Sequence, residues 1–322
     1  MRPLFRSTSG FARYAWGVLA FNVAVVLWGA VVRATNSGAG CGRHWPACNG
    51  EVMPELASHE LLIELAHRAT SGLALLLVVA MAVWAWRAFP AGHRVRRGAA
   101  LSMALILVEA LLGAGLVLFE LVADDKSAFR AFSMAAHLVN TFLLLGALTL
   151  TGWWASGGGD VRVRGRGALG AVLLSALGAT ILVGATGAVT ALGDTLFPKT
   201  TVGFEFSSTA HFLERLRIVH PLLAIATGVY ITIVAWVVRR ARPTPATLRL
   251  ATILTTLFAM QVAAGVINIV LRVPLWMQLT HLFLADCVWI ALVLAAASAL
   301  EDRASEITSE VAFPAPPRPA AV

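Results

Sequence analysis

Apolar stretches of about 20 residues recur along the chain and are separated by short polar segments. That length is what a helix needs to cross the hydrocarbon core of a bilayer. We therefore expect an all-α integral membrane protein with eight transmembrane helices. The predicted spans lie near Ala15–Val32, Leu61–Trp86, Ala99–Leu118, Phe132–Trp153, Leu169–Thr190, Leu213–Val238, Leu250–Leu271 and Leu275–Ala297.

Composition supports the same interpretation, because 58% of the residues are hydrophobic and only 13% are charged. Soluble domains carry roughly 25% charged residues, so this chain has too few to cover a water-exposed globule. The net charge of +8 does not indicate nucleic-acid binding, since the basic residues lie in short loops without interleaved aromatic side chains. We expect a lipid bilayer as the surroundings and no nucleic-acid partner.

Arginine clusters follow the second, fourth and sixth predicted spans, which predicts the sidedness of the protein. By the positive-inside rule these three loops and both termini face the cytoplasm. The first span, preceded by basic residues, is expected to be a retained signal anchor. The tail from Glu301 is rich in proline and is expected to be disordered. The clusters are Arg87, Arg94, Arg96 and Arg97; Arg162, Arg164 and Arg166; and Arg239, Arg240, Arg242 and Arg249.

The two halves of the chain resemble each other, and parallel repeats of this kind are a known membrane architecture. They predict two four-helix bundles related by a pseudo-twofold axis: residues 1–155, residues 156–300, and a cytoplasmic tail over residues 301–322. The matched positions are Leu27–Ala30 with Leu182–Ala185, His67 with His220, Glu109 and Gly113 with Gln261 and Gly265, and His137 with His281.

Four of the eight histidines fall inside predicted spans, one in each even-numbered span: His67, His137, His220 and His281. Each lies early in its helix, which at about 1.5 Å per residue places all four roughly 10 Å below the outer surface. A single imidazole there could simply hydrogen-bond to a neighbouring helix. An ionisable group inside a span is nevertheless a functional hypothesis, and histidines on facing helices can hold a haem. The pairing predicts two sites, His67 with His137 and His220 with His281.

Haem carries two propionates, which arginine can bind through paired hydrogen bonds. Basic residues near the outer ends of the spans are candidates for this role. The alternative is that each arginine anchors its helix at the membrane interface. The candidates are Arg33, Arg68, Arg215, Arg217 and Arg272.

Cysteines break the symmetry between the halves, because only the first outer loop carries a pair, Cys41 and Cys48. The loop is expected to face an oxidising compartment, where disulfides persist. A zinc site would need further ligands, and no second cysteine pair is present. We therefore expect a disulfide, with a structural and a redox-active role both open. Cys287 stands alone in the last span and is expected to be a packing residue.

An acid also distinguishes the first half, where Glu64 precedes His67 by three positions and so shares its helix face. A carboxylate beside a haem pocket can accept a proton or stabilise a developing cation. The alternative is an ion pair with Arg68 or Arg33. We infer that the first half carries out the chemistry. Glu109, matched by Gln261, could serve a structural hydrogen bond or a proton path.

Three runs together resemble haem A synthase, and the resemblance extends over nearly the whole chain. They are GlyAlaValValArgAlaThrAsnSerGlyAlaGlyCys (Gly29–Cys41), TrpProAlaCysAsnGly (Trp45–Gly50) and GluLeuAlaHisArg (Glu64–Arg68). Few other families combine a cysteine pair, this helix start and three further span histidines. Where the family shows CysPro, this chain has Cys41 followed by Gly42, which we interpret as loop variation.

The resemblance implies an oxidoreductase that converts the C8 methyl of haem O to a formyl group through a hydroxylated intermediate, giving haem A for terminal oxidases. It implies that His67 and His137 face the substrate haem and that His220 and His281 ligate a haem b cofactor. Glu64 matches the family's essential acid. The implied setting is a bacterial cell membrane, with haem O synthase as a partner and an electron acceptor that the residues do not identify.

Two other functions also fit parts of the pattern. A dihaem cytochrome b-type electron carrier would hold two permanent haems of equal standing, but it does not explain why Glu64 and the cysteine pair occur only in the first half. A transporter built from repeats would have broken helices near the midplane and no haem. The histidines here are predicted near one face of the membrane instead.

Overall fold

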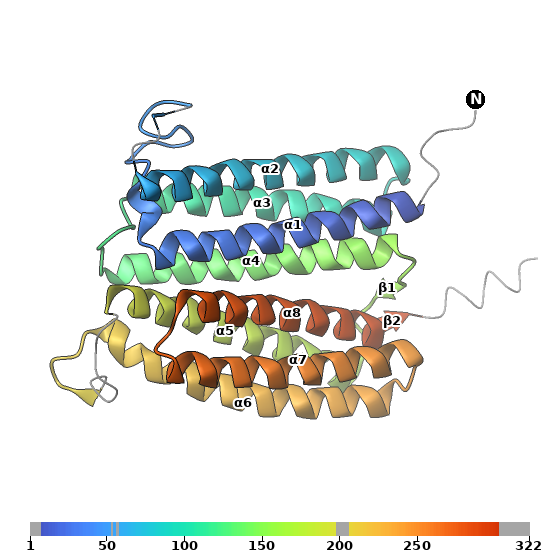
Figure 1. Cartoon of the computed structure of the whole chain (residues 1–322). Helices are drawn as coiled ribbons and strands as arrows, with labels where there is room; N and C mark the ends of the chain where they lie inside the picture. The colour runs from blue at the N-terminus through green and yellow to red at the C-terminus, as the bar shows by residue number, and fades with distance from the viewer. Residues whose placement is uncertain (1–7, 53, 56–57, 198–205, 303–322) are drawn as a thin grey trace, which may run out of the picture.

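A computed structural model describes residues 8–52, 54–55, 58–197 and 206–302 of the chain. Within these residues, eight helices are long and apolar enough to cross a membrane, and they confirm the predicted all-α membrane fold. Figure 1 shows the helices running roughly parallel to one another, with the start of the first helix and the final strand at the same side of the molecule. The predicted tail beyond Asp302 and the first basic residues, Arg2 and Arg6, lie outside the described residues.

Each helix extends beyond its predicted apolar stretch at one end or at both, although α7 ends one residue before the predicted end. Polar caps explain part of this extension: the hydroxyl groups of Ser58, Ser127 and Thr244 accept hydrogen bonds from backbone N–H groups in the first turns of α2, α4 and α7. The bounds are α1 Thr8–Ala34, α2 His59–Ala88, α3 Arg94–Leu118, α4 Ala128–Ala155, α5 Gly167–Leu196, α6 Phe212–Ala241, α7 Pro245–Val270 and α8 Leu275–Leu300, with a short 3-10 helix η1 at Ser37–Ala39 and strands β1 Asp160–Val161 and β2 Glu301–Asp302.

The helices form two groups of four. In the first group each of α1 to α4 packs against the next and α4 closes onto α1, while α5 to α8 repeat this order in the second group. The groups meet where α1 and α4 pack against α5 and α8. Trp289 of α8 stacks on Phe142 of α4 at 5.2 Å and donates a hydrogen bond to its carbonyl oxygen at 2.6 Å. The two groups consist of helices within residues 8–155 and 167–300; the predicted division into halves and the pseudo-twofold axis between them stay predictions.

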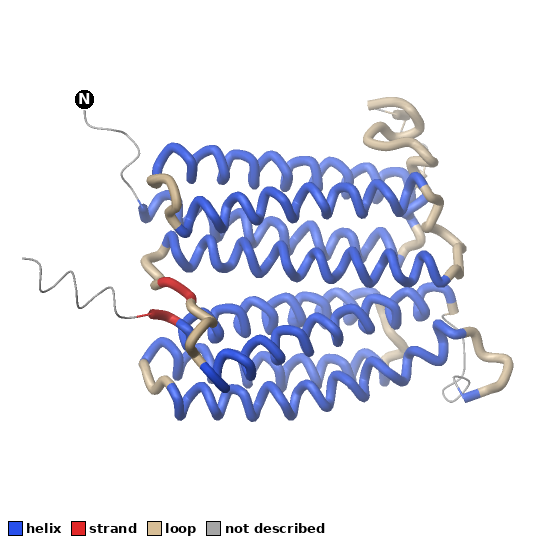
Figure 2. Tube along the Cα trace, turned by 180° about the vertical axis from the view of Figure 1, so that it is seen from behind, coloured by secondary structure: helices blue, strands red, loops and turns tan. Residues whose placement is uncertain are grey.

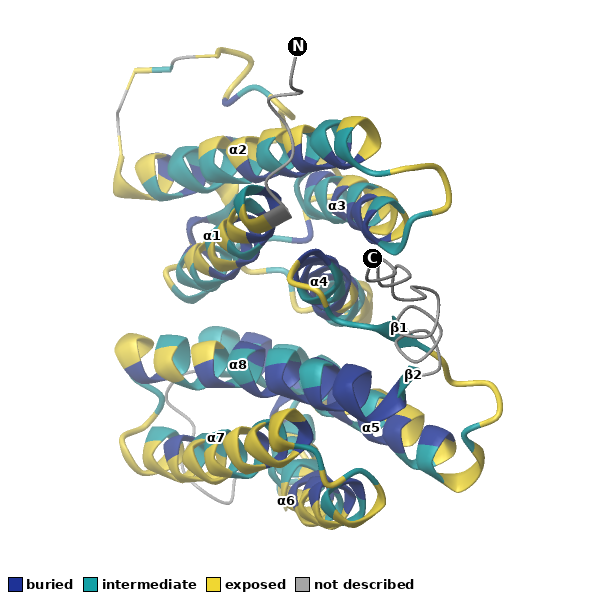
Figure 3. Cartoon of the chain, turned by 90° about the vertical axis from the view of Figure 1, so that its right-hand side faces the viewer, coloured by how far each residue is buried: buried dark blue, intermediate teal, exposed yellow. Residues whose placement is uncertain are grey.

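Apolar side chains also cover the outside of the molecule. Figure 3 shows the buried residues concentrated on α4 and α8, which lie between the groups, and exposed residues on the outer helices. Leu76, Leu111 and Leu222 are among the large apolar side chains on that outer surface, each more than 60% exposed. Such a surface would drive association in water, whereas lipid tails solvate it in a bilayer.

The two short strands join the linker between the halves to the end of α8. β1 pairs antiparallel with β2, and Arg162 forms an ion pair with Asp302 at 2.9 Å. Figure 2 shows this strand pair at the end of the molecule where the chain termini leave. The prediction of a disordered tail from Glu301 is therefore wrong for its first two residues, because the linker offers them backbone partners and a cation.

Candidate functional site

The four span histidines lie about two to three turns into α2, α4, α6 and α8. These four helices run in the same direction, so the four imidazoles occupy the same end of the molecule. That end is opposite the strand pair and carries the loop between α1 and α2 (Figure 1). The similar depth expected from the sequence therefore holds within the fold.

Each of these histidines packs against a glycine on the helix that precedes it. A β-carbon built on Gly187 would lie 3.0 Å from His220 Cε1, and one built on Gly29 would lie 3.1 Å from His67 Cε1. A larger side chain at either glycine would therefore meet the imidazole ring directly. The four pairs are Gly29 with His67, Gly113 with His137, Gly187 with His220, and Gly265 with His281.

These contacts correct the register of the repeat between α1 and α5. The sequence match paired Gly29 with Gly184, but Gly187 is the residue that faces the histidine in the second half. Gly184 instead faces Phe142 across the interface between the halves. A glycine–alanine pair occurs at both positions of α5, so apolar similarity alone could not choose between two registers one turn apart.

In the second half, the ring centres of His220 and His281 lie 6.4 Å apart, with their planes perpendicular. An iron held between two imidazoles has each nitrogen about 2 Å away, which places the ring centres roughly 6 Å apart. His281 Nδ1 is buried and has no hydrogen-bond partner within the described chain, whereas His281 Nε2 lies 3.3 Å from the amide nitrogen of Gln261. These residues fit a haem with two axial histidines.

A haem also fits the number of ligands that are present. Among the described residues, no three His, Cys, Asp or Glu side chains gather as a metal site made only of protein would require. A porphyrin supplies four nitrogens itself, so two imidazoles complete its coordination. Thr186 Oγ1 lies 3.3 Å from His220 Nδ1 and orients this ring toward Nε2 ligation.

In the first half, His67 and His137 lie near the starts of α2 and α4, at the same end of the bundle. His67 Nδ1 is buried without a hydrogen-bond partner among the described residues. His137 Nδ1 lies 3.0 Å from the Glu109 carboxylate, which leaves its Nε2 for a ligand. Glu109 thus makes a hydrogen bond to a candidate haem ligand, one of the two roles that its sequence position left open.

Glu64 lies one turn before His67 and is almost fully buried. One carboxylate oxygen accepts a hydrogen bond from the backbone N–H of Cys41 at 2.8 Å, and the other contacts Arg68 at 2.5 Å. The ion pair that stood as the alternative to a catalytic role is therefore present, with Arg68 and not with Arg33. The catalytic role of Glu64 stays a prediction.

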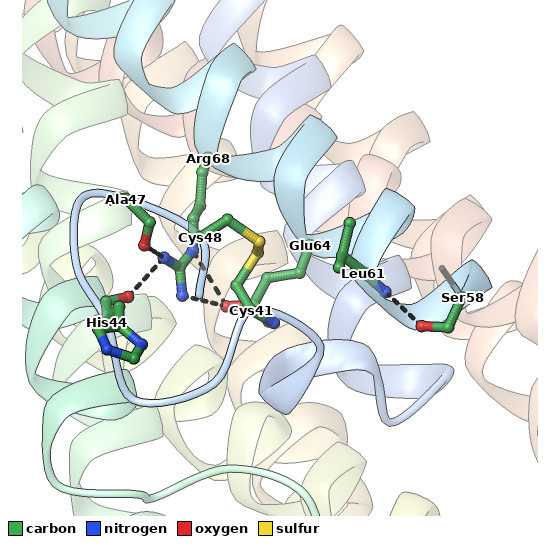
Figure 4. Close-up of a disulfide and its surroundings, with 8 residues drawn as sticks. All are labelled: Cys41, His44, Ala47, Cys48, Ser58, Leu61, Glu64 and Arg68. Atoms are coloured by element: carbon green, nitrogen blue, oxygen red, sulfur yellow. Dashed lines mark hydrogen bonds and ion pairs between the residues drawn. A yellow bond between two sulfur atoms is a disulfide. The ribbon is translucent and has the colours of Figure 1, made fainter. Parts of the chain in front are cut away.

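Arg68 connects the same acid to the outer loop (Figure 4). Its guanidinium donates to the carbonyl oxygens of His44 and Ala47 at 2.6 and 2.7 Å. Cys41 and Cys48 form a disulfide, as predicted, and are both buried. The loop is thus closed on itself and held onto α2 directly above His67.

Three of the other candidate propionate partners, Arg33, Arg215 and Arg217, have protein partners in the structure. Arg33 crosses from α1 to the second half, donating to Thr195 Oγ1 at 2.6 Å and to Gln278 Oε1 at 2.8 Å. Arg217 pairs with Asp194 at 2.9 Å, and Arg215 donates to the carbonyl oxygen of Ser208 at 2.9 Å. Arg272 follows α7 in a left-handed backbone conformation, with a φ of 58°. Their contact with propionates stays a prediction.

Sequence reasoning missed several polar residues of the spans. Asn140 and Thr141 contact Glu109, and Thr186 contacts His220. Asp286 is completely buried in α8, and neither of its carboxylate oxygens has a partner within the described part of the chain. Position within an apolar span was the signal that could have singled out Asp286, since a carboxylate there is costly.

Some known proteins match nearly the whole length of this chain, and others match about a third of it. A profile of the family described as cytochrome oxidase assembly protein matches residues 12–293. Two proteins of Thermus thermophilus, each called protoheme IX farnesyltransferase, are 53% and 52% identical over 303 residues, which is 93% of this chain and 50% of each relative. The chain thus spans about half the length of these curated relatives.

Shorter matches join the chain to proteins called heme A synthase. The one from Geobacillus kaustophilus is 38% identical over 123 residues, covering 37% of this chain and 39% of that protein. The one from Alkalihalophilus pseudofirmus is 40% identical over 125 residues, covering 37% of this chain and 41% of that protein.

Proposed function

This chain belongs to the family of cytochrome oxidase assembly proteins, and from that membership we propose that it is a haem A synthase, an oxidoreductase that converts haem O to haem A. In finer terms, the C8 methyl of haem O would become a formyl group through a hydroxylated intermediate. The observation that carries the proposal is the pairing of four histidines, one on each even-numbered helix, into two sites that differ chemically.

We assign the resident cofactor, haem b, to His220 and His281. The 6.4 Å between their ring centres and the free nitrogen of His281 support this assignment. A bound haem b supplies one-electron transfer. The contribution of the chain is to hold two imidazoles at a fixed separation, with Gly187 and Gly265 allowing the preceding helices to approach the rings closely.

The substrate haem belongs in the first half, between His67 and His137. Glu64 lies next to this pair and is the candidate for holding or moving a proton, because a carboxylate can exchange one with a reacting group. Its partners, the Cys41 N–H and Arg68, hold the carboxylate in place. Arg68 and the disulfide loop also cover this end of α2, which limits the access of water from the loop side.

Haem O must come from an enzyme that attaches a farnesyl group to protohaem. The Thermus relatives are named for that reaction and are about twice as long as the region they share with this chain. We propose that this chain works beside such a haem O synthase. Oxidation of the substrate methyl requires an electron acceptor, and a haem b held by His220 and His281 would supply one-electron transfer toward it.

We also propose that the histidine end faces outward and that both termini are cytoplasmic. Support comes from the arginine clusters, which lie at the opposite end of the molecule from the histidines. Arg94 at the start of α3, Arg162 beside β1 and Arg239 near the end of α6 illustrate this placement.

A chromatogram of extracted haems tests the function. The chain is expressed together with a haem O synthase in a host that lacks haem A, and the extract is separated and measured by mass. We expect haem A or its hydroxylated precursor. Only haem B and haem O, from folded and red protein, would contradict the synthase and favour the dihaem electron carrier.

A further inference from the structure

The carboxylate of Glu109 is held by three donors from α4. Asn140 Nδ2 and Thr141 Oγ1 each lie 2.5 Å from one of its oxygens, and His137 Nδ1 lies 3.0 Å away. Glu109 stands about two to three turns inside the outer end of α3, at a depth where an ionised group is costly without partners. The cluster therefore compensates a buried carboxylate and aims it at one imidazole.

The second half replaces this whole cluster. Gln261 occupies the place of Glu109, and its amide nitrogen lies 3.3 Å from His281 Nε2. Counting along α8 from His281, the positions that match Asn140 and Thr141 hold Leu284 and Ala285. The carboxylate, amide and hydroxyl groups of the first half are thus replaced in the second half by one neutral amide and two apolar side chains.

We propose that Glu109 is the positioning residue that makes the two haem sites unequal. It fixes His137 through Nδ1 so that Nε2 faces the substrate haem, and it lends negative charge to that ligand. A carboxylate on the far nitrogen of a metal-bound imidazole makes the ligand more basic. A more basic ligand favours ferric over ferrous iron and lowers the reduction potential of the haem.

Gln261 gives His281 an uncharged partner, at Nε2 and not at Nδ1, so no carboxylate adds negative charge to this ligand and the haem of the second half has the higher potential. Electrons released in the first half then move toward the second half energetically downhill. This inference rests on the proposed assignment of a haem to each histidine pair, and it deepens that assignment by stating how the chain gives the two haems different potentials.

Two reciprocal substitutions test the proposal on the full-length protein, purified in detergent and loaded with haem O in addition to its resident haem. Glu109→Gln gives the first half the side chain that the second half already uses, and Gln261→Glu does the reverse. Potentiometric titration followed by absorbance resolves the haems, and ferric electron paramagnetic resonance reports the ligand field of each. Neither measurement requires turnover.

We expect Glu109→Gln to raise the potential of the lower-potential haem only, and Gln261→Glu to lower that of the other haem only. Both variants should keep the haem content of the unsubstituted protein. Unchanged potentials and resonance spectra in Glu109→Gln would overturn the proposal. If Glu109→Gln instead loses the added haem, retention of that haem by Glu109→Asp supports a positioning role for the carboxylate, and loss in both variants overturns it.

The result separates this inference from the proposed function. If the chain produced no haem A but the two variants shifted opposite haems in opposite directions, the synthase would fail and the role of Glu109 would stand. If haem A formed while Glu109→Gln changed neither haem, the synthase would stand and the role of Glu109 would fail.

Discussion

The two halves of the molecule place their histidines alike but surround them differently. In both, each imidazole packs against a glycine of the preceding helix. Only the first half adds a disulfide-closed loop, held onto the helix by Glu64 and Arg68. The second half uses Arg217 and Asp194 at the matching end of its helices and has no loop cysteines.

This difference shows that the backbone positions of the histidines and the charged groups around them can vary independently. The shared glycine contacts fix where an imidazole lies, so both halves can hold the same kind of ligand. The charged groups near the two pairs then differ: Glu64 and Glu109 lie next to His67 and His137, whereas an Arg217–Asp194 ion pair lies one turn before His220. A carboxylate next to the histidines suits a haem that reacts, whereas a charge-balanced ion pair suits a haem that stays.

The largest expected effect is the loss of the resident haem. His220→Ala and His281→Ala each remove a proposed axial ligand, so we expect the purified protein to lose its bound haem b. His67→Ala and His137→Ala are the matched controls in the first half and should retain it. The ratio of haem to protein, measured by absorbance after extraction, checks the comparison. Full retention in the second-half variants would contradict the assignment.

Substitution of Glu64 should stop the chemistry and leave the resident haem in place. We expect Glu64→Gln to lower haem A formation by about 10²–10⁴-fold, the usual contribution of a positioned acid or base. Glu214→Gln is the control, because Glu214 is an equally buried carboxylate that caps α6 in the second half. Product is measured by chromatography of extracted haems. Normal turnover in Glu64→Gln would reduce this residue to its ion pair with Arg68.

Opening the disulfide should destabilise the first half by a smaller amount. Closing a loop this short contributes about 2 kcal/mol by the chain-entropy relation. We expect the double variant Cys41→Ser, Cys48→Ser to melt at a lower temperature and to turn over more slowly, because the Cys41 N–H holds Glu64. Cys287→Ser is the control. A melting temperature equal to that of the control would show that the loop holds without its disulfide.

A single methyl group tests the corrected register of the repeat. In Gly187→Ala the new β-carbon would lie 3.0 Å from the His220 ring, whereas in Gly178→Ala on the same helix it would meet nothing within 4 Å. We expect only the first variant to shift the absorbance bands of the resident haem, with a loss of about 1 kcal/mol in stability from overpacking. Identical spectra and melting curves for both variants would reject the close contact.

Apolar length was enough to predict the eight helices, and the positions of the histidines predicted that four imidazoles lie at one end of the molecule. The disulfide also followed, from two cysteines in one short loop. The contacts between side chains could not be predicted from the sequence. Arg33 was one candidate for a propionate, with anchoring at the membrane interface as the alternative. Its hydrogen bond to Gln278 could not be predicted, because the packing of the halves is a property of the assembled fold. The strand at Glu301 was missed for the same reason, since its partner lies far away in sequence.

The glycine–histidine contacts have a consequence for how the protein is made. Every pair joins two helices that are consecutive in the chain, so each hairpin contains one complete contact. A helical hairpin that enters the membrane during synthesis can form its glycine–histidine contact before the next pair of helices has left the ribosome. The four histidines would then be positioned one after another as the hairpins form. A porphyrin would bind to a site whose ligands are already in place.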